Sequence, residues 1–336
     1  MRLYCELFMK TSKQFNVGLI SAILCLLAVS THPVIIDLHS EDFDVIFYTF
    51  CTVFFEFILS TPVLMYELLR KRHHINQNYN DNTAEIITPT NARIKRPIFR
   101  FLIIGGIFSI AQLFVTFGLE SADATTAAIA FKSSMIFTII FGFVFLKEEV
   151  SITQIIFTAV IFVALYYSLS KGTFTPLKID FGAIILVLVP LLWTVGHTMT
   201  KPLLQEKISS PTEVIWIRTG IGSSILAIVY FGILANPIST FSILLRPANL
   251  INVILIGLAY LMGHLFWYYA IKNTDIALSS AIQAPQPIIT AILSTLVQPG
   301  GIYGYQVIGI SFIVTSILII IFDKRNQNIS VYSRSG

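Results

Sequence analysis

The sequence predicts an all-α integral membrane protein with ten transmembrane helices, arranged as two inverted five-helix repeats. Of its 336 residues, 55% are hydrophobic and 12% are charged, and the mean hydropathy is +0.79. This composition leaves too little polar surface to cover a soluble domain of this size. Apolar runs of about 20 residues, the length that crosses a bilayer, lie at 15–36, 45–67, 98–119, 123–146, 151–169, 180–200, 211–235, 250–271, 275–297 and 303–322.

An internal repeat is the second observation. A shift of 152 positions aligns residues 102–167 with residues 254–319 without a gap. Polar identities then fall at Asp123/Asp275, Thr138/Thr290 and Gln154/Gln306. Shared apolar composition does not explain matched polar residues, and a duplicated multi-span unit is typical of secondary transporters. We therefore predict one five-helix repeat over residues 15–169 and a second over residues 180–322.

Basic residues are the third observation, because they predict the orientation. With the N-terminus inside, seventeen Lys and Arg residues fall in inner segments and three in outer segments. This split follows the positive-inside rule, so we expect the tails, residues 1–14 and 323–336, and the loop at 70–97 to be cytoplasmic in a multi-pass plasma-membrane protein. Because each repeat has an odd number of spans, the second enters from the opposite side and is inverted.

Motifs for several other functions are missing from the sequence. It has no phosphate-binding glycine loop, serine nucleophile elbow or His-Glu-x-x-His run. The His73-His74 pair lacks further ligands at metal spacing, and the neighbouring basic cluster is more typical of a topology signal and anionic-lipid contact than of a nucleic-acid site. We predict no cofactor, no metal and no nucleic-acid partner. An intramembrane enzyme with His197 or His264 as base would need an acid or metal partner, which the sequence does not suggest.

Polar side chains at membrane depth are costly to bury, so we take them as candidate substrate-binding or coupling residues. In the first repeat these are Glu56, Gln112 and Lys132. Counting the rise of about 1.5 Å per residue places Glu56 and Lys132 close enough in depth to pair. Such a pair either fixes helix packing or contacts a charged substrate or a coupling proton.

The second repeat carries Arg218 and His264 at membrane depth. His264 aligns with Gln112 under the 152-residue shift, which suggests that both side chains face a shared interior. The alternatives are that Arg218 snorkels to the headgroups and that His264 is a packed, hydrogen-bonded helix partner.

The ninth expected helix contains Gln283-Ala284-Pro285-Gln286-Pro287. Pro285 and Pro287 remove two backbone donors and free the carbonyls one turn earlier, so we expect a kink. Gln283 and Gln286 are expected to face a substrate cavity there, although a purely architectural kink is the alternative. Trp193 is a candidate for the aromatic lining of that cavity, or a packing residue.

Together these features resemble the EamA-type transporters of the drug/metabolite transporter superfamily. The residues that carry the resemblance are Ala127-Ala128-Ile129-Ala130 through Phe145-Leu146-Lys147-Glu148-Glu149 into Gln154, and Trp193 followed by Lys201. The resemblance implies alternating access by rocking of two halves around a central cavity. The sequence departs from the family where Gln298-Pro299-Gly300-Gly301 replaces the second acidic segment. Lys132 looks more like the helix-four lysine of the nucleotide-sugar and phosphate-ester branch.

We therefore predict a secondary active transporter, an exporter or exchanger, of small organic metabolites. A proton or a counter-substrate is the candidate coupling partner, and the pattern predicts no particular oligomeric state. One alternative is an antiporter of anionic or phosphorylated metabolites or nucleotide-sugars, with Lys132 and Arg218 as the anion clamp. The alternative from another class is a non-transporting membrane scaffold or receptor.

Overall fold

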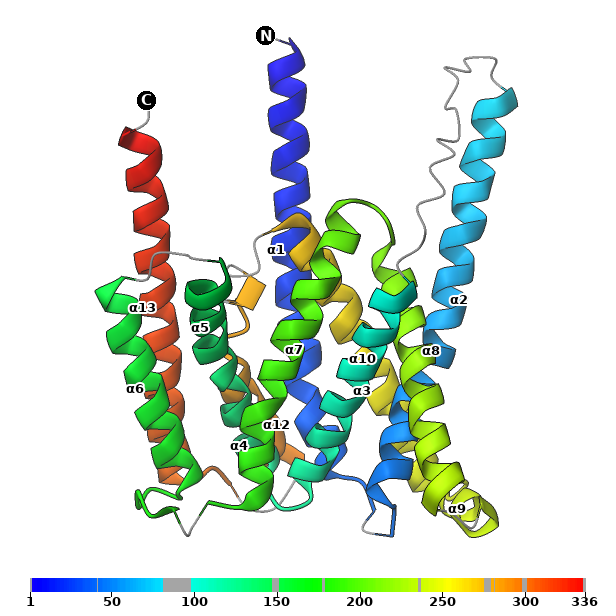
Figure 1. Ribbon diagram of the computed structural model, residues 1–336, viewed down its shortest axis with the longest axis vertical. Coiled ribbons are helices and arrows are strands. Elements are labelled where there is room, and N and C mark those ends of the chain that lie inside the picture. Colours follow the sequence, from blue (N-terminus) through cyan, green and yellow to red (C-terminus); the bar gives the residue numbers. More distant parts are fainter. Residues whose placement is uncertain are drawn as a thin grey trace.

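The chain folds into a bundle of long helices standing side by side (Figure 1). A computed structural model describes residues 2–40, 42–80, 98–146, 151–176, 179–234, 237–274, 279–280, 282–297 and 301–334. These residues contain helices and turns but no strand, which confirms the all-α class. The helices are α1 (Arg2–Asp37), α2 (Val45–Asn80), α3 (Ile98–Leu119), α4 (Ala124–Ala130), η1 (Phe131–Ser133), α5 (Ser134–Leu146), α6 (Ile152–Leu169), α7 (Phe181–Gln205), α8 (Pro211–Val229), η3 (Tyr230–Leu234), α9 (Pro237–Leu244), α10 (Pro247–Asn273), α12 (Gln286–Val297) and α13 (Gly304–Arg334).

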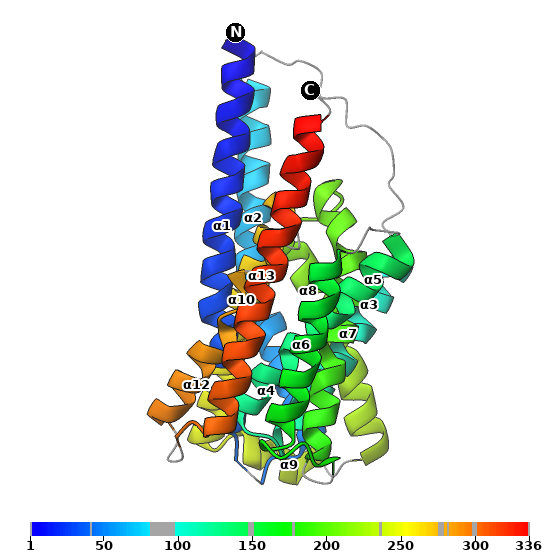
Figure 2. The ribbon, with the colours of Figure 1, turned by 90° about the vertical axis from the view of Figure 1, so that its left-hand side faces the viewer.

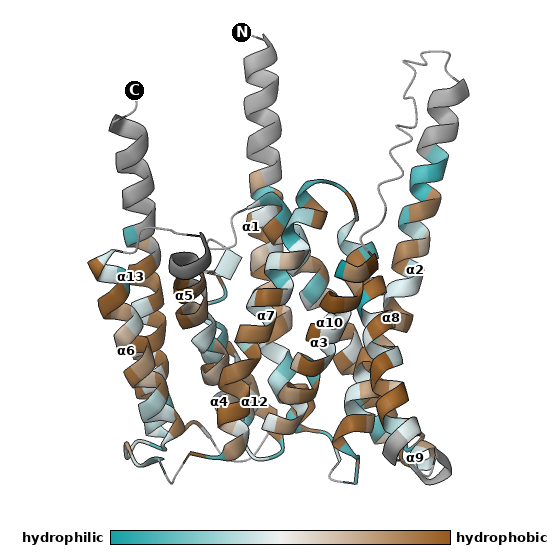
Figure 3. Ribbon diagram, viewed as in Figure 1, coloured by the Kyte–Doolittle hydropathy of each residue, from teal (hydrophilic) through white to brown (hydrophobic). Residues whose placement is uncertain are grey.

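The apolar parts of the helices identify a multi-pass membrane protein. Within the described residues, eight helical segments are long and apolar enough to cross a bilayer. Two shorter apolar helices, Gln286–Val297 and Gly304–Ile320, lie where the ninth and tenth spans are expected. In Figure 3 the ribbon is coloured mainly as hydrophobic over the body of the bundle and as hydrophilic at connections and on part of the projecting end of α2.

Three helices extend well beyond the predicted apolar spans. The first begins at Arg2, the second continues to Asn80 and the last continues to Arg334. Hydropathy predicts only the part of a helix that lies in lipid. The polar extensions continue the helices because they lack the Pro and Gly residues that would end a helix. All three extensions project from the same end of the bundle (Figure 1). Residues 81–97 of the expected loop and the Lys147–Glu149 segment lie outside the described residues.

Packing follows the internal repeat. Helix α1 of the first repeat packs along α10 of the second. The equivalent pair, α7 of the second repeat and α3 of the first, packs in the same way. Equivalent helices also pack together: α2 on α8, and α6 on α13. The α6–α13 pair is seen side by side in Figures 1 and 2. The interface between the repeats therefore runs through the middle of the bundle, where a transporter places its pathway.

Two of the matched polar positions have a structural role. Asp123 caps α4 by accepting a hydrogen bond from the Thr126 backbone at 2.9 Å. The amide of Gln306 donates to the same carboxylate at 3.1 Å, which ties α13 to the start of α4. Asp275, the counterpart of Asp123, lies outside the described residues. The Asp123–Gln306 contact gives these two repeated residues a packing role.

Helices α3 and α7 approach so closely that a side chain would not fit at Gly182. A Cβ atom there would lie 2.3 Å from the carbonyl oxygen of Gly118. We expect Gly182→Ala to lower the unfolding free energy by roughly 1–3 kcal/mol, the usual cost of overpacking. The measurement is the melting temperature of the purified protein. Gly106→Ala is the control, because nothing lies within 4 Å of a Cβ at that position; equal melting temperatures would contradict the close contact.

Candidate functional site

Two helices at equivalent positions of the repeats are interrupted. The first changes from α4 through the 3-10 turn Phe131–Ser133 into α5. The second turns at residues 283–285 before α12 begins. The 152-residue shift places Phe131, the start of the first break, directly on Gln283, the start of the second. Pro287 explains part of the second break, because it has no N–H to donate to the carbonyl of Gln283.

Lys132 connects the two breaks. Its Nζ donates to the backbone carbonyl of Gln283 at 2.7 Å and to Oε1 of Gln286 at 2.8 Å. The Gln283 carbonyl, which lacks a donor at Pro287, therefore accepts from the lysine of the other repeat and from the Gln286 backbone at 3.2 Å. Lys132 is only 5% exposed, and none of the described carboxylates lies within 4.0 Å of its ammonium group.

The two glutamines are buried, and their amide groups donate hydrogen bonds to α1. The Gln283 amide donates to the carbonyl of Ala22 at 2.8 Å, and the Gln286 amide donates to that of Val29 at 3.4 Å. Both acceptors belong to α1, which covers the break. The proline pattern predicts freed carbonyls but does not predict which helix covers them.

Trp193 lies close to the first break. Its ring packs on Phe131 with 4.9 Å between centroids, and the indole is only partly buried. Phe131 is the residue before Lys132, so Trp193 borders the place where the two interrupted helices meet.

Glu56 pairs with Arg218 and His264, and the expected Glu56–Lys132 pair is wrong. Oε1 of Glu56 accepts from Arg218 Nη2 at 3.3 Å and contacts His264 Nδ1 at 2.7 Å. The residues Glu56 and Arg218 are 2% and 3% exposed, so Arg218 does not snorkel. Counting residues along a helix gives depth but not direction around the axis, which is why the sequence paired the wrong cation with Glu56.

Aromatic residues surround the Arg218 guanidinium. Nη1 donates to the Tyr268 hydroxyl at 3.1 Å, and the group lies 4.4 Å from the ring centroid of Phe108. Stacking on a ring face stabilises a desolvated cation. Nε of Arg218 has no hydrogen-bond partner among the described residues. The guanidinium therefore keeps one buried donor unused. We refer to Glu56, Arg218, His264 and Tyr268 as the Glu56 cluster.

The equivalent residues Gln112 and His264 meet at Tyr260. Gln112 donates to the Tyr260 hydroxyl, and the His264 ring stacks on the Tyr260 ring at 5.6 Å. The side chain of His264 is 21% exposed, more than that of Glu56. His32, which the sequence analysis missed, contacts Tyr260 edge-on at 4.5 Å and the Ala259 carbonyl at 3.0 Å. The same criterion of polar side chains at membrane depth would have identified it.

The buried charges do not balance. Among the described residues the buried charged side chains are Glu56, Lys132 and Arg218, which is one carboxylate against two cations. Glu56 compensates Arg218, whereas Lys132 contacts only neutral oxygens. An unmatched cation in a low-dielectric interior attracts an anion. The described residues contain no group of three side chains suited to hold a metal ion.

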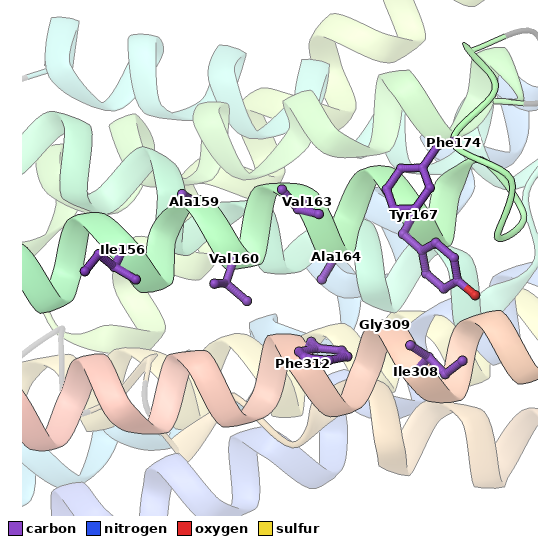
Figure 4. Close-up of a pocket in the computed structure, with 10 residues that line it drawn as sticks. All are labelled: Ile156, Ala159, Val160, Val163, Ala164, Tyr167, Phe174, Ile308, Gly309 and Phe312. Carbon is purple, nitrogen blue, oxygen red and sulfur yellow. The ribbon is translucent and has the colours of Figure 1, made fainter.

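An apolar groove of about 600 Å³ lies elsewhere, between α6 and α13. Figure 4 shows Val160 and Val163 on one helix and Phe312 on the other beside it. The Tyr167 hydroxyl is the one side-chain polar group among the residues that line this groove. The apolar lining of this groove suits a hydrocarbon chain and not a polar solute. The candidate site for a polar solute is therefore the interior around Lys132 and the Glu56 cluster.

Comparisons with known proteins agree with this architecture. Twenty-one chains of solved structures match; one of them, titled only "Crystal structure of protein", superposes with a TM-score of 0.54 and 13% identity over 92% of this chain and 97% of its own. That likeness supports the fold alone. A search of the curated proteins finds no match. The EamA-like transporter family matches residues 16–170 and 180–322, which together make up most of the sequence and coincide with the two repeats. The chain therefore belongs to the EamA-like transporter family.

Proposed function

We propose that this protein is a secondary active transporter that exports or exchanges small organic anions by alternating access. Carboxylates, phosphate esters and nucleotide-sugars are the substrate classes that fit. The observation that carries the proposal is the position of Lys132: a buried cation, without a carboxylate partner among the described residues, that bridges two interrupted helices. The site residues are Glu56, Gln112, Lys132, Trp193, Arg218, His264, Gln283 and Gln286.

Interrupted helices support a binding site for a physical reason. Backbone polar groups at membrane depth must be paired, so broken helices occur where protein or a polar cavity satisfies them. In secondary transporters such breaks hold the substrate at the interface of the repeats. Lys132 now donates to two neutral oxygens, which leave its charge uncompensated, whereas an anion adds charge–charge attraction in a low-dielectric interior. An arriving anion would therefore compete well for Lys132.

The proposed orientation has ten spans in the plasma membrane, with both termini inside. It rests on the seventeen-to-three distribution of basic residues. We expect a membrane-impermeant thiol reagent added to intact cells to label a cysteine introduced at Ser40 but not one introduced at Asn80. Labelling of both after deliberate permeabilisation is the control. Outside labelling at Asn80 in intact cells would contradict the orientation.

Exchange in proteoliposomes tests the transport function. Vesicles containing the purified protein are preloaded with one member of a panel of phosphate esters, carboxylates, nucleotide-sugars, amino acids and organic cations, and entry of the same labelled compound is measured. We expect saturable exchange with anionic members. No exchange with any member would favour a scaffold or receptor, and exchange of cations alone would contradict the anion assignment.

A further inference from the structure

The Glu56 cluster is a buried charged link between the two repeats. Glu56 lies on α2 in the first repeat, whereas Arg218 lies on α8 and His264 on α10 in the second. The other ion pairs of the described residues involve more exposed side chains: Glu67–Lys71 lies within α2, and Lys171–Asp180 and Asp42–Arg246 join connecting segments. Rocking of one repeat against the other would strain the Glu56 contacts directly.

Separating these charges inside the protein is costly as long as Glu56 is ionised. Breaking a buried pair leaves uncompensated charge, with a penalty of several kcal/mol. Protonating the carboxylate removes its charge and lowers that penalty. We propose that the Glu56–His264 pair binds the coupling proton of transport, and that proton uptake releases α2 from α8 and α10. This inference rests on the proposed transport function and adds the coupling ion to it.

Geometry gives the proton a route. The His264 ring is 21% exposed while the Glu56 side chain is 3% exposed, so the imidazole is the more accessible member of the pair. A hydrogen bond from His264 to a carboxylate places the proton on Nδ1. A proton taken up at Nε2 makes imidazolium, and the Nδ1 proton then moves to Oε1 of Glu56. One proton has entered, His264 is again neutral with its proton on Nε2, and Glu56 is a neutral acid.

The other ionisable groups around Glu56 do not offer the same function. They are His32 on α1, Arg218 on α8, and Tyr260 and Tyr268 on α10, with His197 on α7 beside Arg218 and His264. Helix α3 contributes the uncharged Gln112 and Phe108. His32 bonds a backbone carbonyl, and Nδ1 of His197 accepts from Trp267 at 3.2 Å. Neither histidine contacts a carboxylate, which leaves His264 as the partner for proton exchange.

Protonation has a consequence for the substrate. Once Glu56 is neutral, Arg218 loses its counter-charge while its Nε already lacks a partner among the described residues. With Glu56 neutral, the interior that holds Lys132 and Arg218 carries more uncompensated positive charge and attracts the anion more strongly, and by linkage the anion also favours proton binding. The cluster therefore couples proton and anion movement in the same direction across the membrane, so that an exported anion leaves with a proton and an entering anion brings one in.

Infrared difference spectroscopy of the full-length protein in lipid nanodiscs tests the proton site without any substrate. Lowering the pH from about 8 to about 5, the range in which histidine titrates, should produce a protonated-carboxyl band that is lost in Glu56→Gln. Glu67→Gln is the matched control on the same helix and should retain the band. His264→Gln should slow the appearance of the band after a pH jump at least about tenfold.

The outcomes separate this inference from the transport function. A spectrum that Glu56→Gln leaves unchanged would overturn the proton site, even with active anion exchange. A Glu56-dependent band without exchange would support the proton site and contradict the transport function. If Glu56→Gln does not fold, Glu56→Gln/Arg218→Met replaces it, because it removes both charges.

In vesicles with entrapped pH dye, anion entry should acidify the lumen for the wild type but not for these variants; acidification that persists would overturn the coupling.

Discussion

Lys132→Met is expected to lower anion exchange in proteoliposomes at least about tenfold, because a hydrogen bond to a charged group contributes roughly 1.5–3 kcal/mol. Methionine has a similar length and satisfies no acceptor, so the carbonyl of Gln283 keeps only its bond from the Gln286 backbone. The measurement is the initial rate of exchange for the best anion of the panel, normalised to the amount of folded protein.

The matched control for Lys132→Met is Lys171→Met. Lys171 forms an ion pair with Asp180, but its side chain is 51% exposed and lies in the α6–α7 connection. An exposed pair contributes little to stability, so exchange should stay near the wild-type rate. Normal exchange by Lys132→Met would show that the lysine serves packing alone.

Single changes in the Glu56–Arg218 pair are expected to destabilise the protein strongly. Arg218→Met leaves Glu56 buried with only His264, and Glu56→Gln leaves Arg218 without its counter-charge. Removing one member of a buried pair costs about 3–5 kcal/mol, whereas removing both relieves much of that cost. The measurement is the free energy of unfolding of the two single variants and the double variant.

Lys132→Met provides the control for this cycle. Lys132 does not contact Glu56, so combining Lys132→Met with Glu56→Gln should give additive losses. Additive losses for the Glu56→Gln/Arg218→Met combination would contradict the pair seen in the structure. Non-additive losses for Glu56 with Lys132 would favour the pairing expected from the sequence.

Much of the helical plan was predictable because lipid imposes a simple length and composition rule. The predicted run at 98–119 coincides with α3, and that at 151–169 begins one residue before α6. The short helix α9 was missed because Pro237–Leu244 is too brief to stand out as a span. The end of α2 was misjudged because its polar continuation is helical but not lipid-compatible.

The partners of the site residues were harder to predict than the residues themselves. Membrane depth identified Glu56, Lys132 and Arg218 as unusual, and all three are buried. Their pairing depends on rotation about each helix axis and on helix neighbours, which hydropathy does not encode. The contact between Lys132 and the Gln283 carbonyl also depends on a break in η1 that contains no proline and gave no sequence signal.

An experimental structure with the best-exchanged anion bound is the decisive test of the Lys132 site. We expect the anion to lie between the two interrupted helices, within hydrogen-bonding distance of Lys132 Nζ, and to replace at least one of the lysine bonds to Gln283 and Gln286. An anion bound elsewhere, with both of those lysine bonds intact, would contradict it.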